Sequence, residues 1–326
     1  MSQHEHMHQR PILYVVVPCY NEEEVLPETS RRLEAKLRSL MDADKIARDS
    51  RVLLANDGSR DRTWELICEL HDDPSHDGIF TGISLAHNRG HQNVLFAGLM
   101  AALERGCDIS VSMDADLQDD IDAIDQMVDA YLGGADIVYG VRNDRQTDSR
   151  FKRCTAEAFY NVMRRMGTET VPNSADFRLM DARALEALSL YGETNLFLRG
   201  IVPSLGFETA EVYYRRAERF AGESKYPLSK MLSLAVDGIT SFSVTPLRMV
   251  TLAGIVFVAI ALLVLVYALV SLLFGTTVSG WTSLLISIWF VGGALMLSLG
   301  IVGEYVGRIY MESKHRPRYI VAEELS

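Results

Sequence analysis

The sequence has 326 residues, which is enough for one large domain or two smaller ones. Its formal net charge of −11 gives no electrostatic support for nucleic-acid binding. The four cysteines are far apart and form no Cys-x-x-Cys pair, so we expect a reducing compartment and neither a disulfide framework nor a zinc site. The N-terminus is polar and shows no signal peptide, and residues 1–10 fit a disordered, histidine-bearing tail better than a metal site.

Apolar, β-branched segments alternate with helical patterns over the first half of the chain. The predicted strands cover residues 12–17, 51–55, 79–85, 109–113 and 135–139. This alternation indicates a parallel α/β sheet with right-handed crossovers. Ligands of such sheets bind at the carboxyl ends of the strands. We therefore expect one crevice lined by the polar residues at these ends, namely Asn21, Asp57, Asn88, Asp114 and Asp116.

The fourth predicted strand ends abruptly in two carboxylates, Asp114 and Asp116. Mg²⁺ or Mn²⁺ held by one or two carboxylates takes its remaining ligands from water and substrate phosphates. The pair therefore indicates a metal that binds a diphosphate. The alternative is an acidic turn in which Asp119 or Asp120 is the N-cap of the next helix. No Gly-x-Gly-x-x-Gly follows the first strand and no Walker A motif occurs, which disfavours a dinucleotide dehydrogenase and a P-loop NTPase.

Asp57 lies in an Asp-Gly-Ser sequence at the end of the second strand. Its carboxylate could accept a hydrogen bond from a base or ribose, or it could be an Asx-type cap of a turn.

Three segments in this order resemble the signature of family 2 glycosyltransferases with the GT-A fold: VVPCYNEE (16–23), NDGSRDRT (56–63) and DADLQD (114–119). The last of them resembles the branch that acts on polyprenyl phosphates, which includes dolichyl-phosphate mannose synthase and the bactoprenol glucosyltransferases. The proline common after this motif is replaced by Asp120-Ile121, a change at the start of the next helix. The resemblance implies Mg²⁺ or Mn²⁺ on Asp114 and Asp116. It also implies a nucleotide-sugar site made by Pro18, Tyr20, Asn21, Glu23, Asp57, Asp114, Ala115, Asp116 and Gln118.

Basic residues follow the fifth predicted strand in an otherwise acidic protein. Arginine suits bidentate phosphate contacts. The place of this loop after the strand, and the resemblance, favour an acceptor-phosphate loop over a solvated charged loop. With basic groups from later segments, the predicted acceptor-phosphate residues are Arg142, Arg145, Arg150, Arg199, Arg219 and Lys225.

The segment DFRLM (176–180) resembles the bactoprenol glucosyltransferase branch. The resemblance implies that Asp176 lies beside the acceptor as a catalytic carboxylate, with Asp116 as the catalytic carboxylate on the metal. A phosphate monoester has a second pKa of about 6, so much of the acceptor is already dianionic at neutral pH and needs little help from a base. Asp176 could instead orient the acceptor or its arginines, or simply cap structure beside Arg178.

Two long apolar segments near the C-terminus, about 247–274 and 281–303, read as a hairpin of two membrane spans. Between residues 228 and 244 apolar residues recur at helical spacing, which fits either a helix at the bilayer surface or a core helix. Basic residues flank the outer ends of both spans, and the positive-inside rule places both termini and the catalytic domain in the cytoplasm. Glycines in the second span permit close helix packing and hint at a homo-oligomer.

The chain is thus predicted as a tail (1–10), an α/β GT-A catalytic domain (11–215), interface helices (216–246), two transmembrane helices (247–303) and a cytoplasmic tail (304–326). The resemblance implies an inverting, metal-dependent transfer of a sugar, with glucose favoured, from a UDP-sugar to undecaprenyl or another polyprenyl phosphate at the cytoplasmic face of the inner (plasma) membrane. The product would serve glycan modification.

Three alternatives stay open. The enzyme could transfer mannose or another sugar from a GDP- or UDP-sugar. A processive polysaccharide synthase would carry a Gln-x-x-Arg-Trp motif, which does not occur here. A non-catalytic membrane anchor with a degenerate transferase domain is opposed by the intact carboxylates Asp57, Asp114, Asp116 and Asp176.

Overall fold

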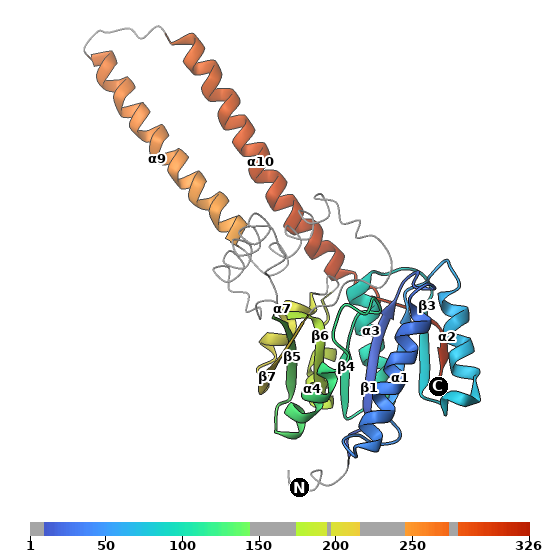
Figure 1. Ribbon diagram of the computed structural model, residues 1–326. Coiled ribbons are helices and arrows are strands. Elements are labelled where there is room, and N and C mark those ends of the chain that lie inside the picture. The colour runs from blue at the N-terminus through green and yellow to red at the C-terminus, as the bar shows by residue number, and fades with distance from the viewer. Residues whose placement is uncertain (1–9, 144–173, 194–196, 216–244, 274–279) are drawn as a thin grey trace. The chain divides into compact units, whose positions relative to one another are not determined.

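The computed structural model describes residues 10–143, 174–193, 197–215, 245–273 and 280–326. The chain divides into two compact units. One unit holds a sheet with its covering helices and includes residues 317–326, and the other holds two long apolar helices (Figure 1). Each unit is considered by itself below.

The first unit is built on an eight-stranded mixed sheet with the order β7-β5-β6-β4-β1-β2-β3-β8. Neighbouring strands β4, β1, β2 and β3 are parallel to one another, and so are β5 and β7, whereas β6 and β8 run antiparallel to their neighbours. The strands are β1 (Leu13–Cys19), β2 (Arg51–Asn56), β3 (Phe80–Leu85), β4 (Ile109–Ser112), β5 (Ile137–Arg142), β6 (Ser174–Asp181), β7 (Thr209–Tyr214) and β8 (Val321–Leu325).

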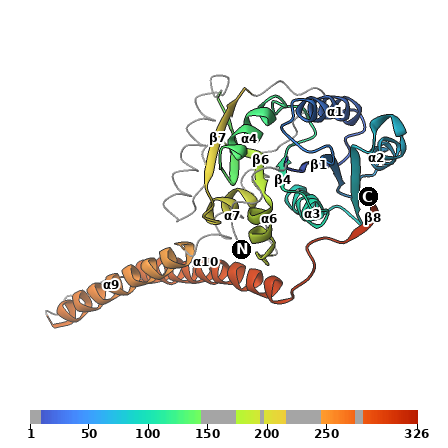
Figure 2. The same cartoon turned by 90° about the horizontal axis from the view of Figure 1, so that it is seen from below.

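Helices cover both faces of this sheet, so its central strands are buried on both sides. Figure 2 shows α1, α2 and α4 on one face and α3, α6 and α7 on the other. The helices are α1 (Leu26–Asp42), α2 (Thr63–Asp72), α3 (His91–Glu104), α4 (Ala123–Leu132), α6 (Ala182–Ser189) and α7 (Leu198–Ser204), with a short 3₁₀ helix, η1 (Pro74–His76).

The hydrophobic core explains why these segments pack as they do. Val15 and Val17 of β1 belong to a cluster with the leucines of α1, whereas Val16 faces α3, as expected from the alternation of side chains along a strand. Gly98 lets α3 approach the sheet closely, because a Cβ atom there would lie 2.5 Å from Cγ1 of Val16. This close contact fixes the position of α3, which begins at His91.

The predicted α/β class is confirmed, and the sheet is mixed where the strand pattern predicted a parallel one. Strand β6 lies antiparallel between β4 and β5, in a segment read from the sequence as a motif and not as a strand. Its side chains alternate: Phe177 and Leu179 join the core cluster, while Asp176 and Arg178 are buried polar residues. A strand with paired charges on one face does not show the apolar signature of a buried strand.

The last residues of the segment predicted as a cytoplasmic tail, 304–326, form a strand of this sheet. Helix α10 continues to Ser313, and β8 then pairs with the edge of β3. The amide of Ala86 donates to the carbonyl oxygen of Ile320 at 2.9 Å, and Arg105 forms a 2.7 Å ion pair with Glu324. The last segment therefore covers an otherwise open strand edge.

The second unit contains α9 (Thr245–Leu273) and α10 (Trp281–Ser313). Their aromatic rings Phe257 and Phe290 meet edge to face with centroids 5.4 Å apart. Within the described part of the chain, one helical stretch, Phe290–Ser313, is long and apolar enough to cross a membrane by length and composition. The predicted hairpin of two spans remains a prediction, and most of the predicted interface segment lies outside the described residues.

Candidate functional site

The carboxyl ends of β4, β1, β2 and β3 lie side by side at one edge of the sheet, because these strands are neighbours and parallel. Asn21, Asp57 and Asn88 follow β1, β2 and β3, and the pair Asp114 and Asp116 follows β4. The structure thus places the polar residues that the sequence singled out at the same edge.

The loops after β1 and β2 are joined by reciprocal hydrogen bonds. Asn21 adopts a left-handed conformation (φ 55°), its amide donates to Oγ of Ser59, and its side-chain oxygen accepts from the amide of Arg60. Glu23 accepts from the amide of Arg62 at 3.0 Å. Asn21 and Glu23 therefore build the wall of the site, and they line a pocket of about 490 Å³ that also includes Arg60.

Two other predicted nucleotide residues border the same loop. Pro18 lies within β1, and the side chain of Tyr20 is 41% exposed, so its ring is available to a ligand. Their predicted contacts with the nucleotide remain predictions.

Asp57 is buried, and its carboxylate organises the loop before α3. Oδ1 accepts from the amide of Arg89 at 2.7 Å and Oδ2 from the amide of Gly90 at 2.9 Å. Burial raises the pKa of Asp57, and the two amides oppose this shift. Gly58 (φ +62°) leaves no room for a side chain, because a Cβ atom there would lie 2.8 Å from the backbone of His87. Asp57 thus holds the loop that presents His91, and its contact with a nucleotide remains a prediction.

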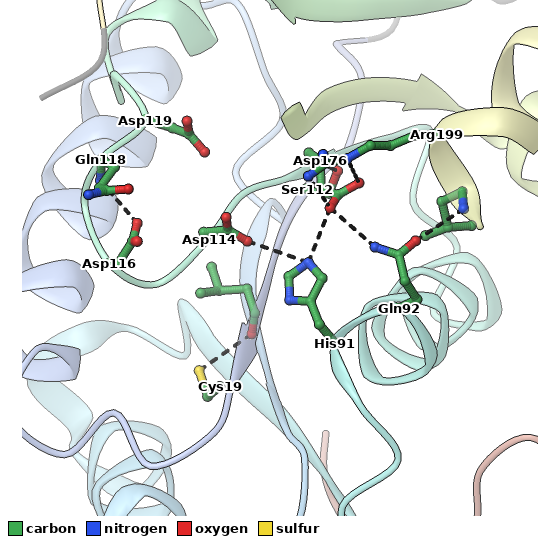
Figure 3. Close-up of polar contacts among 12 residues, drawn as sticks. Cys19, His91, Gln92, Ser112, Asp114, Asp116, Gln118, Asp119, Asp176 and Arg199 are labelled. Carbon is green, nitrogen blue, oxygen red and sulfur yellow. Dashed lines mark hydrogen bonds and ion pairs between the residues drawn. The ribbon is translucent and has the colours of Figure 1, made fainter. Parts of the chain in front are cut away.

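The acidic turn after β4 presents Asp114 and Asp116 at the edge of the sheet. Ala115 between them is buried, and its carbonyl oxygen accepts from Oγ1 of Thr29 at 2.8 Å. The amide of Gln118 donates to Oδ1 of Asp116 at 3.2 Å (Figure 3). The buried Ala115 anchors the turn while its two neighbours remain partly exposed.

The capping alternative for this turn is not what the structure shows. Helix α4 begins at Ala123 with Asp122 at the N-cap position, and no side chain caps it. Asp120 instead accepts from the amide of Asp122, and Asp119 points to β5 and β7, where its partners lie.

The carboxylates at this edge fit a divalent cation. The pKa of Asp114 is raised to about 6, chiefly by burial and also by the nearby carboxylates Asp119, Asp176 and Asp116, while His91 opposes the shift. Negative charge is thus concentrated where a cation would relieve it. Within the described residues no three His, Cys, Asp or Glu side chains form a complete metal cage. Two carboxylates with open positions suit Mg²⁺ or Mn²⁺ completed by a diphosphate and water.

Asp176 lies next to this acidic turn, at the centre of a cluster of hydrogen-bond donors (Figure 3). Arg178 donates to Oδ1 at 2.7 Å, and Arg199 donates to both oxygens at 3.2 and 3.0 Å. Gln92 donates to Oδ2 at 3.2 Å, and Nε2 of His91 lies 3.3 Å from the same atom. Burial alone would raise the pKa of Asp176, but Arg199, His91 and Arg178 outweigh it and hold that pKa well below its usual range.

His91 joins the two carboxylate groups of the site. Its Nε2 lies 3.6 Å from Oδ1 of Asp114 and 3.3 Å from Oδ2 of Asp176. Burial lowers the pKa of His91, but Asp176 and Asp114 outweigh that effect and raise it. The structure therefore brings Asp114, Asp176 and Arg199 together through a histidine that the sequence analysis did not single out.

His91, Gln92 and Arg178 were all missed as site residues. The available signal for the first two was position, because they start the helix that follows the third strand. Arg178 gave no such signal, since the segment around it was not recognised as a strand.

Arg142, a predicted acceptor-phosphate residue, has protein partners. Nη2 lies 3.1 Å from Oδ1 of Asp119, and Nε donates to the hydroxyl of Tyr214 at 3.1 Å. Burial lowers the pKa of Arg142, but Asp119 and Tyr214 outweigh it and raise the pKa. Much of the charge of Arg142 is therefore already compensated. Four further predicted acceptor residues lie outside the described residues: Arg145, Arg150, Arg219 and Lys225.

The chain was compared with known proteins. Residues 14–203 match the family model described as "Glycosyl transferase family 2". The chain is 50% identical over 316 residues to YkoT, an uncharacterized glycosyltransferase of Bacillus subtilis (strain 168), covering 97% of this chain and 93% of that protein. It is 40% identical over 315 residues to the bactoprenol glucosyl transferase of Shigella phage SfV, covering 95% and 98%.

A similar protein from Escherichia coli (strain K12), a prophage bactoprenol glucosyl transferase homolog, is 39% identical over 312 residues, covering 94% of this chain and 97% of that protein. The family match covers more than half of the chain, and the relatives align over nearly its whole length. The site at the carboxyl edge of the sheet lies within the matched region. The chain therefore belongs to glycosyl transferase family 2.

Proposed function

We propose that this protein transfers glucose from a UDP-sugar to undecaprenyl or another polyprenyl phosphate, with inversion at the anomeric carbon. The observation that carries the proposal is that His91 joins two groups of charged side chains. A carboxylate pair suited to a metal diphosphate, Asp114 and Asp116, adjoins an arginine-rich cluster suited to a phosphate, centred on Asp176 and Arg199. Relatives named bactoprenol glucosyl transferase, about 40% identical over nearly the whole chain, support the lipid acceptor and glucose.

The donor would lie over the carboxyl ends of β1, β2 and β4. The loops after β1 and β2 form a wall that includes Asn21 and Glu23, with Tyr20 exposed beside it. Asp114 and Asp116, with Gln118 close by, would hold Mg²⁺ or Mn²⁺ on the diphosphate. When bound, that ion would supply charge stabilisation of the departing nucleoside diphosphate.

The acceptor phosphate would meet the outward side of the Asp176 cluster. A phosphate monoester with a second pKa of about 6 is largely dianionic at neutral pH, so its oxygen is already a competent nucleophile. Asp176 is ionised and fully hydrogen-bonded to Arg178, Arg199, Gln92 and His91. It is therefore suited to orienting these donors and poorly suited to taking up a proton.

The geometry of attack follows from the two sides of the site. Asp114 would face the donor diphosphate and Asp176 would face the acceptor. His91 lies between these two carboxylates. A phosphate oxygen that approaches the anomeric carbon from the side opposite the leaving group would displace it in one step. The bond from the anomeric carbon to the nucleotide breaks as the new bond to the acceptor phosphate forms, and the configuration inverts.

A membrane location fits both the acceptor and the second unit. The stretch Phe290–Ser313 of α10 can span a bilayer by length and composition. We propose that α9 forms the second span and that the catalytic unit faces the cytoplasm of the inner membrane, as the flanking basic residues indicate. Polyprenyl phosphate would then reach the site from the inner leaflet. A homo-oligomer remains a prediction from the glycines of α10.

The test is transfer of radiolabelled sugar by the full-length protein in detergent. A panel of UDP- and GDP-sugars is incubated with undecaprenyl phosphate, with Mn²⁺ or with EDTA. We expect label from UDP-glucose to enter the organic phase in the presence of Mn²⁺ and not with EDTA. Asp116→Ala should abolish transfer, whereas Asp129→Ala, which alters an exposed carboxylate of α4 paired with Lys45, should not.

The outcomes separate the alternatives. If only GDP-mannose gave labelled lipid, the proposed donor would change from UDP-glucose to GDP-mannose, and the proposed reaction class would stand. No labelled lipid from any donor would favour the non-catalytic anchor, and transfer unaffected by Asp116→Ala would contradict the metal site.

A further inference from the structure

The carboxylate of Asp176 has more hydrogen-bond donors around it than it can accept from, and Figure 3 shows three of the donor side chains, His91, Gln92 and Arg199. Gln92 Nε2, His91 Nε2, Arg178 Nη2, and Nε and Nη2 of Arg199 all lie within 3.3 Å of its oxygens. An ionised carboxylate offers about four lone-pair positions, so these five donor atoms exceed its capacity. A donor can therefore turn toward another anion without leaving Asp176 unsatisfied.

Two of the four donor side chains are fixed in place by the backbone of Leu198. Arg178 donates from Nη1 to the carbonyl oxygen of Leu198 at 3.2 Å, and Gln92 accepts from the amide of Leu198 at 3.0 Å. The side chain of Arg178 is only 3% exposed. Arg178 and Gln92 thus hold both Asp176 and the first turn of α7, which sets the position of Arg199.

The other two donor side chains face outward. The side chain of His91 is 43% exposed and that of Arg199 is 42% exposed, whereas the Asp176 side chain beneath them is 4% exposed. Because an ionised carboxylate only accepts hydrogen bonds, the His91 nitrogen that faces Asp176 and Asp114 carries hydrogen. An anion that approaches Asp176 from solvent would meet these two donors first.

We propose that His91 and Arg199 together bind the phosphate of the lipid acceptor, with Asp176 as the buried anion that orients both. This rests on the proposed function and adds His91 as a binding residue. Arg178 and Arg199 together carry one more charge than Asp176, which leaves positive charge on this side of the site for a phosphate. Nε2 of His91 lies 3.6 Å from Asp114, so a phosphate held there would lie beside the donor diphosphate.

A role for His91 as a ligand of the metal is the main competitor. A metal ligand must offer a lone pair, whereas the nitrogen of His91 that faces Asp114 carries hydrogen. The geometry therefore favours contact with an anion, and the two roles predict different binding defects.

The experiment measures acceptor binding separately from donor binding. Full-length protein in detergent with EDTA is titrated with undecaprenyl phosphate, and undecaprenol serves as the probe without phosphate. We expect His91→Ala and Arg199→Ala each to weaken binding of undecaprenyl phosphate about tenfold to a hundredfold, as for loss of a charge-assisted hydrogen bond. Undecaprenol binding should not change, and His91→Gln, which keeps a donor, should lose less.

The matched control is His76→Ala. His76 also lies between two carboxylates, 2.8 Å from Glu34 and 3.9 Å from Asp73, but it precedes β3 and so lies at the opposite edge of the sheet. It should leave acceptor binding unchanged. Thermal unfolding shows whether each variant is folded. We expect the His91 variants to fold, because this side chain is half-exposed.

Binding of UDP with Mn²⁺ decides between the two roles. In His91→Ala it should match the wild type. The inference would be overturned if His91→Ala bound undecaprenyl phosphate as the wild type does, or if it lost only the binding of UDP with Mn²⁺. Transfer by the wild type would still support the proposed function in either case. Failure of the wild type to bind or glucosylate any polyprenyl phosphate would instead overturn the proposed function, and the inference with it.

Discussion

The guanidinium group of Arg142 lies 3.1 Å from Oδ1 of Asp119, so the end of β5 is joined to the acidic turn that carries Asp114 and Asp116. Tyr214 of β7 donates its hydroxyl to the same carboxylate oxygen. The side chain of Asp119 is 1% exposed, and within the described residues its Oδ2 has no hydrogen-bond partner. The stability of this acidic turn therefore depends on Arg142.

Arg142→Ala should destabilise the protein, because it leaves the buried carboxylate of Asp119 without its cation. We expect a loss of about 1 to 3 kcal/mol in the free energy of unfolding, measured by denaturant titration followed by fluorescence. Asp119→Asn combined with Arg142→Met should lose less than Arg142→Ala, since no unpaired charge remains. Unchanged stability with weaker acceptor binding would show instead that Arg142 is a phosphate residue.

Asp176 should contribute to stability in a pH-dependent way. Burial opposes ionisation, but Arg199, His91 and Arg178 hold its pKa well below the usual range. A depressed folded pKa gives stability that is present above the unfolded pKa of about 3.9 and is lost as the pH falls through the folded pKa. Asp176→Asn should therefore be less stable at neutral pH, and its stability should fall less on acidification below pH 4 than that of the wild type.

The same shift predicts the pH profile of transfer. Asp176 stays ionised near neutral pH, because its pKa is held well below the usual range. The pH profile of kcat/KM should therefore show no limb near neutrality that Asp176→Asn removes. Asp176→Asn should act mainly by raising the KM for the acceptor, because Arg199 loses its anchor. A limb at pH 6 to 7 that this substitution removes would identify Asp176 as a general base.

Removal of β8 should destabilise the β3 edge of the eight-stranded sheet. Deletion of residues 320–326 removes the ladder to β3, the acceptor for the Ala86 amide and the ion pair between Arg105 and Glu324. At about 0.5 to 1.5 kcal/mol for each hydrogen bond, the expected loss is roughly 2 to 5 kcal/mol. Hydrogen exchange should show faster exchange of the Ala86 amide, whereas Glu323→Ala should leave it protected. Equal protection in the deletion would contradict the pairing.

Gly98→Ala should destabilise the first unit, which contains the sheet, even though alanine is the better helix former. The added Cβ would lie 2.5 Å from Cγ1 of Val16, and overpacking of this kind costs about 1 to 3 kcal/mol. The combination with Val16→Ala should recover part of the loss measured by thermal unfolding. A Gly98→Ala variant more stable than the wild type would show that α3 can move away from the sheet at little cost.

The first five strands follow from sequence because each is a short segment rich in apolar residues, although small polar residues interrupt β3 and β4. Strands that are covered on both faces need such a composition. The acidic turn follows from the abrupt change after β4. Strand β6 does not, because Asp176 and Arg178 interrupt its apolar pattern and are stabilised by partners on α3 and α7. Strand β8 could not be predicted either, because Glu323 and Glu324 make it polar and its partner β3 is far from it in the sequence.

The site could be predicted only where its chemistry is local. Asp114 and Asp116 are neighbours in sequence, so their joint action shows in the motif. The role of His91 depends on its contacts with Asp114, which follows β4, and with Asp176 of β6. The charge of Arg142 is largely compensated by Asp119. Pairings of this kind depend on the order of the strands, which the sequence pattern did not reveal.

The pairing of β3 with β8 also affects how the protein is made. A chain leaves the ribosome N-terminus first, and domains generally fold as units during synthesis. Here β3 emerges early, but its outer neighbour, Val321–Leu325, emerges only after α9 and α10 have been translated. A ribosome that carries this chain would therefore bear a nearly complete catalytic unit with one unpaired strand edge while the apolar helices leave the exit tunnel. We expect nascent chains paused before residue 320 to be more sensitive to proteases at β3 than released chains.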